Sequence, residues 1–216
     1  RFRLFYFNGS LRLQKLLAND WTASVRIGRQ RIRTNDRLAF PDGCSSNANW
    51  NQYPYYCSSY DTDLYDYRSE NERRTMDSTE LMLRGEASAA GLRHEFSASL
   101  LRSDYRERYE PTQIYDWVGQ INALRPTALP QNATPYADFN TQRSLRTTEL
   151  QLTDVVRLGE AWSIWLGLRH TALDSASERT DPGERREISY SQQFTTPWGA
   201  IGYKPWAGGF VYASAG

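Results

Sequence analysis

A tyrosine-rich segment, residues 44–74, carries the side chains best suited to bind a ligand. It includes Trp50, Arg73 and Arg74. Its tyrosines are Tyr53, Tyr55, Tyr56, Tyr60, Tyr65 and Tyr67. Aromatic rings with polar tips suit a molecule that is partly apolar and partly hydrogen-bonding, and arginines suit an anionic group. The alternative is a solvated loop whose tyrosines pack on one another.

A second polar segment, residues 109–142, offers Tyr115, Trp117 and Tyr136 with the same ambiguity. We therefore predict a binding surface that draws on both segments. Its predicted contact residues are Trp50, Tyr53, Tyr55, Tyr56, Tyr60, Arg73, Arg74, Tyr115 and Trp117.

Residues that could perform covalent chemistry or hold a metal are poorly placed in the sequence. His94 and His170 have no second histidine or cysteine at metal-ligand spacing, so we interpret both as structural. Asp61, Asp63 and Asp66 resemble half of a calcium loop but lack its glycine and closing glutamate. The nucleophile-elbow, zinc-protease and phosphate-loop motifs are also missing, so we predict no metal and no enzymatic activity.

The two cysteines indicate the cellular compartment, and the charge balance limits the possible partners. Cys44 and Cys57 lie in a polar segment without a nearby histidine, and we interpret them as one disulfide of an exported protein. The 216 residues carry 26 Lys+Arg against 25 Asp+Glu, which gives no electrostatic case for nucleic acid. No apolar run approaches the ~20 residues of a transmembrane helix.

The elements that must position these residues show a period of two. In GEAWSIWLGLRH, Trp162, Ile164, Leu166 and Leu168 alternate with small or charged residues, which predicts a strand. The same alternation begins at residues 21, 79, 92 and 148, and weaker strands are expected at 10–17, 195–203 and 209–215. One apolar and one polar face fit either a soluble sheet or a membrane barrel whose apolar face meets lipid.

Three features favour the membrane barrel. The expected strands, about 12 to 18 residues, exceed the ~5 to 6 of soluble sheets. Short turns at LAND, AAGL, LGEA and KPWAGG alternate with long polar connections at 41–75, 109–142 and 175–193, as periplasmic turns and external loops do. Trp21, Trp162 and Trp206 stand beside short turns, where an aromatic girdle would lie. On this interpretation Trp162, Ile164, Leu166 and Leu168 face lipid. The lumen-facing residues are then Ser163, Gly167, Arg169 and Arg26.

Three units, LANDWTASVRIGRQRIR, LTDVVRLGEAWSIWLGLRH and FTTPWGAIGYKPWAGGFVYASAG, together resemble the barrel of TonB-dependent outer-membrane receptors, especially the ferric-siderophore group. The resemblance rests on the Gly-Leu-Arg-aromatic phrase at Gly167 to His170 and on the strand, Pro-Trp turn and Tyr-Ala-Ser strand from Pro197 to Ser214. It covers most of residues 10–216. The family's plug domain, TonB box and terminal aromatic strand have no counterpart, so residues 1–216 are expected to be part of a larger barrel.

The resemblance implies an all-β, antiparallel transmembrane β-barrel segment of about eight strands, with short periplasmic turns and long extracellular loops. It implies TonB-dependent uptake of a ferric siderophore across the bacterial outer membrane, with the siderophore as transported ligand and no resident cofactor. The implied partners are the siderophore, the TonB complex through a plug domain, and outer-membrane lipid. The alternatives are an outer-membrane barrel enzyme of protease or acyltransferase type, and a soluble ligand-binding β-barrel.

Overall fold

The computed structural model describes residues 3–17, 20–41, 43, 60–125, 128–129, 136–184 and 186–216, which form an all-β structure. The strands are β1 (Arg3–Leu16), β2 (Thr22–Pro41), β3 (Asp61–Ala89), β4 (Leu92–Arg108), β5 (Thr112–Asn122), β6 (Ala137–Phe139), β7 (Thr141–Leu158), β8 (Trp162–Arg179), β9 (Glu187–Tyr203) and β10 (Val211–Ala215). Within these ranges no helix is long and apolar enough to span a membrane. The predicted fold class is confirmed.

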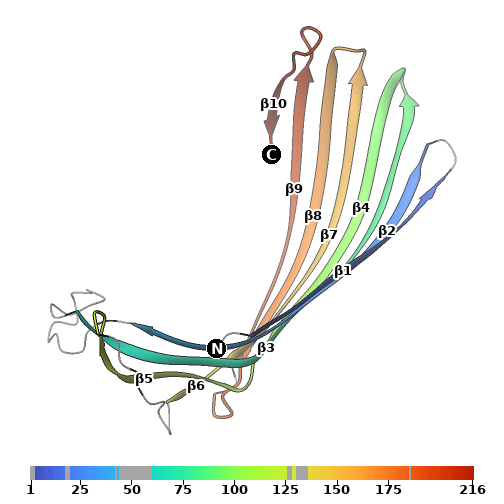
Figure 1. Cartoon of the computed structure of the whole chain (residues 1–216). Coiled ribbons are helices and arrows are strands. Elements are labelled where there is room, and N and C mark those ends of the chain that lie inside the picture. The colour runs from blue at the N-terminus through green and yellow to red at the C-terminus, as the bar shows by residue number, and fades with distance from the viewer. Residues whose placement is uncertain are drawn as a thin grey trace.

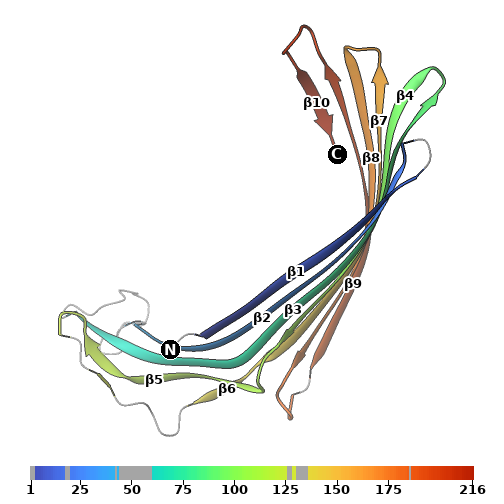
Figure 2. The same ribbon diagram turned by 45° about the vertical axis from the view of Figure 1, so that its right-hand side comes forward.

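One antiparallel sheet contains most of the strands, in the order β1-β2-β3-β4-β7-β8-β9-β10. β5 and β6 lie off this path, because β5 pairs with the outer part of β3 and β6 pairs with β5 (Figure 1). The sheet is strongly curved, and in the described part β1 and β10 form its two edges (Figure 2). The sheet has ten strands in all, and the eight that follow one another on this path agree with the number predicted.

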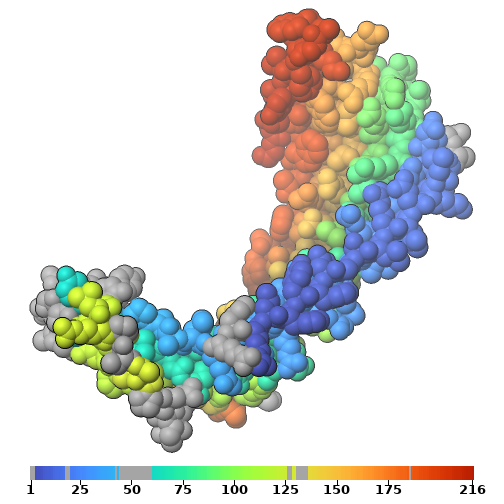
Figure 3. Space-filling model, viewed as in Figure 1, coloured from blue at the N-terminus to red at the C-terminus, as the bar shows by residue number. Residues whose placement is uncertain are grey.

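The sheet is a single layer, and this decides where apolar side chains lie (Figure 3). Val156 is the one hydrophobic residue that is buried in the described part of the chain. Leu13, Val25, Leu81 and Leu100 lie in one cross-strand row, yet they are 62%, 36%, 47% and 42% exposed. A soluble sandwich would cover such a row with a second sheet, so this face needs an apolar environment from outside the chain.

The exposed apolar side chains form a band of limited height, which we call the apolar band. It contains Val25, Ile27, Leu81, Leu83, Leu100, Leu150, Leu152, Leu166 and Leu168. On the same face the next row is charged, with Arg29 Nε 2.5 Å from Asp77 Oδ1 and Arg146 Nε 2.8 Å from Asp104 Oδ1. From the turns to this row β2 contributes residues 22–29 and β3 residues 77–89, and these two spans bracket the ~9–11 residues of a transmembrane β-strand.

The strand ends that flank the four predicted short turns all lie at one end of the sheet, as predicted (Figure 1). Trp21 lies beside the first of them and stacks on Phe96, with ring centroids 6.5 Å apart. Trp162 lies beside the third and stacks on Tyr203 at 4.3 Å. The strand ends that flank the segment with Cys44 and Cys57 lie at the other end, although both cysteines fall outside the described residues.

The predicted long connections are too long. β3 begins at Asp61, inside the expected loop 41–75, and β5 and β6 occupy much of the expected loop 109–142. β8 and β9 likewise extend into 175–193, and β1 begins at Arg3 instead of about residue 10. Beyond the apolar band both faces of a strand carry polar residues, so the hydrophobic alternation that reveals a strand disappears there.

Two glycines on the sheet make room for tryptophan rings. A Cβ atom at Gly85 would lie 2.2 Å from the Trp21 ring, and one at Gly167 would lie 2.0 Å from the Trp198 ring. At Gly199, by contrast, the nearest atom would lie 3.6 Å away, an ordinary contact. Glycine is therefore required by packing at the first two positions and not at the third.

We expect Gly85→Ala to destabilise the folded chain by about 1–3 kcal/mol, the usual cost of overpacking, because Trp21 must leave its place on the sheet. Gly199→Ala is the matched control and should change stability by less than about 0.5 kcal/mol. Urea unfolding followed by tryptophan fluorescence in detergent micelles measures both. Equal effects of the two substitutions would show that the Trp21 contact does not constrain residue 85.

Candidate functional site

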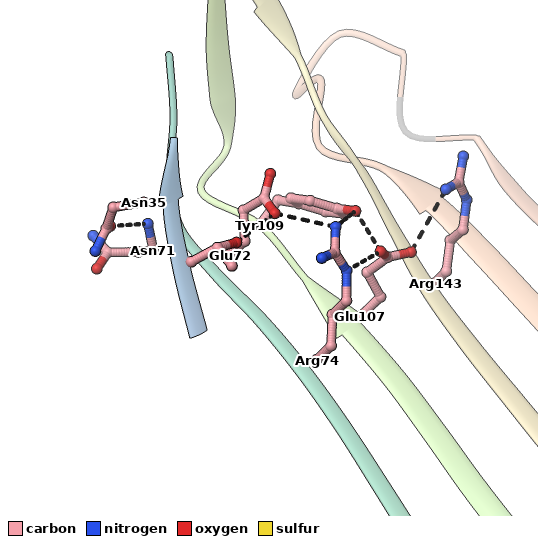
Figure 4. A network of polar contacts seen from close by, with 8 residues as sticks. Asn35, Asn71, Glu72, Arg74, Glu107, Tyr109 and Arg143 are labelled. Atoms are coloured by element: carbon pink, nitrogen blue, oxygen red, sulfur yellow. Dashed lines mark hydrogen bonds and ion pairs between the residues drawn. The ribbon is translucent and has the colours of Figure 1, made fainter. Parts of the chain in front are cut away.

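The polar face beyond the apolar band, at the end opposite the short turns, carries a connected set of charged side chains (Figure 4). Arg74 on β3 donates from Nε to Glu107 Oε1 at 2.8 Å and from Nη2 to Glu72 Oε2 at 3.1 Å. Its Nη2 also donates to the Tyr109 hydroxyl at 3.3 Å, and that hydroxyl donates to Glu107. Arg143 Nη1 lies 3.5 Å from Glu107 Oε2. We call these five residues the Arg74 network.

Burial makes the Arg74 network strongly coupled. Glu72 and Glu107 are 4% and 8% exposed, so each carboxylate depends on the nearby guanidinium. Burial acts to raise the pKa of Glu107, but hydrogen bonds from Tyr109 and Arg74 outweigh it and hold that pKa below its usual range. Burial and the bond to Glu107 raise the pKa of Tyr109 to about 12. At neutral pH Glu107 is therefore charged and Tyr109 is protonated.

A β-bulge next to the network changes which residues share its face. The β2–β3 pairing runs Thr34 with Glu72 and then Asp36 with Ser69, so β3 contains one extra residue. Asn71 has a φ of 55°, and its N–H donates to Asn35 Oδ1 at 2.7 Å (Figure 4). The extra residue switches the alternation of β3. On β3, the odd-numbered residues up to Ser69 therefore lie on the same face as the even-numbered residues from Glu72 onward.

The switched alternation places aromatic side chains beyond the Arg74 network. Phe40, Tyr65 and Tyr115 form an aromatic cluster with ring centroids 5.2 to 6.2 Å apart. Trp117, next but one to Tyr115 on β5, donates from Nε1 to Asp63 Oδ1 at 3.1 Å and is 50% exposed. Tyr115 is 38% exposed and Tyr60 56% exposed. This end of the chain thus presents accessible rings close to hydrogen-bonding groups.

The structure brings some predicted binding residues together and separates others. Tyr60, Tyr115 and Trp117 lie in the outer part formed by β3 and β5. Arg73 and Arg74 are neighbours in β3, so their side chains lie on opposite faces: Arg74 on the polar face and Arg73 on the face of the apolar band. Outside the described residues lie Trp50, Tyr53, Tyr55, Tyr56, Cys44 and Cys57.

Several members of the site have no clear signal in the sequence. Phe40 and Tyr65 were not among the predicted contacts, because residues 41–75 were expected to form a loop and the strand pairing that brings Tyr65 beside Phe40 was not expected. Glu107 and Tyr109 meet Arg74 only through the β3–β4 pairing, in which Arg74 faces Glu107 directly. That pairing could have been found from the AAGL turn, since a hairpin fixes the register of both its strands.

The histidines and aspartates considered for metal binding have other partners. His94 Nδ1 lies 2.8 Å from Asp154 Oδ2, and His170 Nδ1 lies 2.8 Å from Thr195 Oγ1. Asp61 accepts a 2.7 Å bond from Asn122, and Asp66 pairs with Arg68. Among the described residues no group of three or more His, Cys, Asp or Glu side chains could hold a metal ion.

Comparison with known proteins gives a match in structure but not in sequence. The chain matches no family model and no curated protein. The siderophore receptor PiuA from Acinetobacter baumannii superposes with a TM-score of 0.72 at 17% identity, over 99% of this chain and 32% of PiuA. The open form of the ferric-catecholate import receptor Fiu from E. coli K12 gives 0.76 at 11% identity, over 98% of this chain and 35% of Fiu.

A third similar structure is FpvA from P. aeruginosa bound to a heterologous pyoverdine, with a TM-score of 0.71 at 16% identity. It matches over 96% of this chain and 26% of FpvA. The chain thus spans between about a quarter and a third of the length of these structures. PiuA and Fiu are receptors, which agrees with the prediction of a receptor rather than an enzyme. The chain therefore has the fold of a β-barrel segment of the TonB-dependent siderophore receptors, as its sequence motifs predicted.

Proposed function

We propose that this chain forms part of the wall and external surface of an outer-membrane receptor for TonB-dependent uptake of ferric siderophores. The observation that carries the proposal is the structural match to siderophore receptors over nearly the whole chain. Two features of the chain itself support it: the exposed apolar band and the polar face that ends in accessible aromatic rings.

The apolar band supports the location in the outer membrane. Its side chains are exposed to the outside of a single-layer sheet, and its height suits the hydrocarbon core of a bilayer. Trp21 and Trp162 border the band at the turn end, where indole rings favour the membrane–water interface. The charged row of Arg29, Asp77 and Arg146 borders it at the other end. The short turns would then be periplasmic.

The outer part of the polar face supports ligand capture. Ferric siderophores combine apolar, hydrogen-bonding and charged groups, and the aromatic cluster, Tyr60 and Trp117 offer matching contacts. We propose that Trp50, Tyr53, Tyr55, Tyr56 and Arg74 complete this surface. Arg73, on the opposite face, is not expected to join it. Coupling to TonB would run through a plug domain of the same receptor, and no cofactor is required.

The test is uptake of radioactive ferric siderophores by cells that carry the full receptor as their only siderophore receptor. We expect saturable accumulation that disappears when TonB is deleted, because transport needs energy from the inner membrane. A panel of catecholate, hydroxamate and mixed-ligand siderophores then identifies the class that is carried. Receptor that reaches the outer membrane but binds and transports none of these ligands would refute the proposal.

A further inference from the structure

The polar face beyond the apolar band carries more negative than positive charge. On the described strands β2 to β7, its arginines are Arg74 and Arg143. Its carboxylates are Asp36, Asp61, Asp63, Glu72, Glu107 and Asp138. Arg179 of β8 adds one positive charge and lies 2.8 Å from the Asp138 carboxylate. Carboxylates thus outnumber arginines on the face to which the proposed function assigns ligand capture.

The two arginines of the Arg74 network are held by carboxylates of the chain itself. Arg74 donates to both Glu72 and Glu107. Arg143 Nη1 lies 3.5 Å from Glu107 Oε2. A guanidinium that already binds a carboxylate has fewer donors left for an anion from solution, and the neighbouring negative charge opposes the approach of that anion. The network therefore gives an anionic ligand little net attraction.

Two of the carboxylates lie beside the exposed rings of the outer part. Trp117 is 50% exposed and donates from Nε1 to Asp63 Oδ1 at 3.1 Å. Asp63 itself is 3% exposed, so salt and water screen its charge poorly. Asp61 lies two residues away on the same face of β3 and accepts a 2.7 Å bond from Asn122. A ligand that stacks on Trp117 therefore lies close to negative charge.

The sequence that connects these strands brings no excess of positive charge. Residues 42–60, between β2 and β3, contain Asp42 and neither arginine nor lysine. Residues 123–136, between β5 and β6, contain Arg125 and no other charged residue. The charges of Asp42 and Arg125 cancel, so the two segments do not neutralise the excess of carboxylates on the polar face.

We propose that the surface formed by this chain selects ferric complexes that carry no net negative charge, of the trihydroxamate class. Three hydroxamate groups balance the charge of the ferric ion, whereas three catecholates leave three negative charges. Exposed rings can pack on either complex, but nearby carboxylates repel only the anionic one. The polar face thus supplies specificity by repulsion. This inference rests on the proposed function and adds the class of siderophore to it.

The test measures binding of two neutral trihydroxamate complexes, ferrichrome and coprogen, and of the tris-catecholate ferric enterobactin to the purified full receptor. We expect one of the trihydroxamates to bind most tightly to the unmodified receptor. The test variant is Asp61→Asn with Asp63→Asn, in which each amide keeps an oxygen that can accept the existing hydrogen bond. The control variant, Glu86→Gln with Glu160→Gln, removes the same charge at the turn end. Fluorescence-quenching titrations give the dissociation constants.

The expected effect is a change in the ratio of two affinities. In dilute salt, a carboxylate ~10 Å from an ion with three negative charges weakens the binding of that ion about fivefold. The test variant should therefore raise the affinity for ferric enterobactin, relative to the better trihydroxamate, about twentyfold. The control variant should leave this ratio within about twofold of its original value.

The unmodified receptor gives a second measurement that needs no substitution. Added salt should strengthen the binding of ferric enterobactin, because it screens the repulsion, and should leave the binding of the neutral complexes unchanged. Enterobactin binding that weakens with salt would overturn the inference, as would an affinity ratio that the test variant does not change.

Tighter binding of ferric enterobactin than of either trihydroxamate by the unmodified receptor would also overturn the inference, and the proposed function would stand. A receptor that binds no ferric siderophore of either class would refute the proposed function and the inference together.

Discussion

Combined replacement of Tyr60, Tyr115 and Trp117 by alanine is expected to weaken ferric-siderophore binding at least a hundredfold. These rings are 56%, 38% and 50% exposed at the outer end of β3 and β5, where a ligand can reach them. A well-buried aromatic contact contributes about 1–3 kcal/mol to binding, so three together exceed the ~2.7 kcal/mol of a hundredfold change. Equilibrium titration of the purified receptor with the transported siderophore measures the loss.

The matched control for this prediction replaces exposed rings at the opposite end of the sheet: Trp206, Phe210 and Tyr212. Their removal should leave siderophore affinity within about twofold of the unmodified receptor, because they lie at the turn end. Trp117→Phe is a second control, since it keeps a ring but removes the bond to Asp63. Equal affinity of the triple variant and the unmodified receptor would show that the described rings are only a solvated surface.

Arg74→Ala is expected to destabilise the folded receptor by about 1–3 kcal/mol at pH 7. The substitution leaves Glu72 and Glu107 buried without their principal cation, a loss that costs about 3–5 kcal/mol in fully buried pairs. The Arg74 side chain is 35% exposed, and solvent screening reduces that figure. Arg93→Ala is the control, because Arg93 and Glu86 form a well-exposed pair, and it should cost less than about 0.5 kcal/mol.

The effect of Arg74→Ala should fade in acid. The pKa of Glu107 is lowered in the folded state, so its stabilising contribution is present above the unfolded pKa of about 4.3 and is lost as the pH falls through the folded value. Urea unfolding at pH 7 and at pH 3 should therefore show a stability difference between variant and unmodified receptor that narrows at pH 3. A difference of the same size at both pH values would assign the loss to packing of the Arg74 stem.

The sequence predicts the apolar band well because an apolar environment on one face and a polar environment on the other impose opposite requirements on alternate residues. Leu81 and Leu83 on one face and Glu80 and Arg84 on the other leave a clear period of two, and the structure has that alternation. The short turns are identified by their Gly, Asn, Asp and Pro residues, and the neighbouring Trp21 and Trp162 mark where the strands leave the band. The fold can therefore be predicted from the sequence where the two faces of a strand meet different environments.

Beyond the band that contrast ends, and so does the predictive power of the sequence. Asp61 to Arg74 belong to β3, yet their polar and aromatic residues resemble a loop. The bulge at Asn71 cannot be read from alternation, because neither face is apolar there. Arg73 and Arg74 were consequently placed in one binding surface, whereas pairing with β4 puts them on opposite faces.

The bulge also has a consequence for how such a receptor can diversify. Between Asn71 and the short turn, β2 and β3 pair without a shift in register. An inserted or deleted residue there would turn Leu81 and Leu83 to the other face of the sheet. From Asp61 to Ser69, on the other side of the bulge, the register of β3 is already shifted by one residue. Changes of length beyond this point alter which side chains meet the ligand and leave every pair in the wall intact. The bulge thus separates an outer segment that can change in length from a part of the sheet whose register must be kept, so a new outer surface can arise without rebuilding that part.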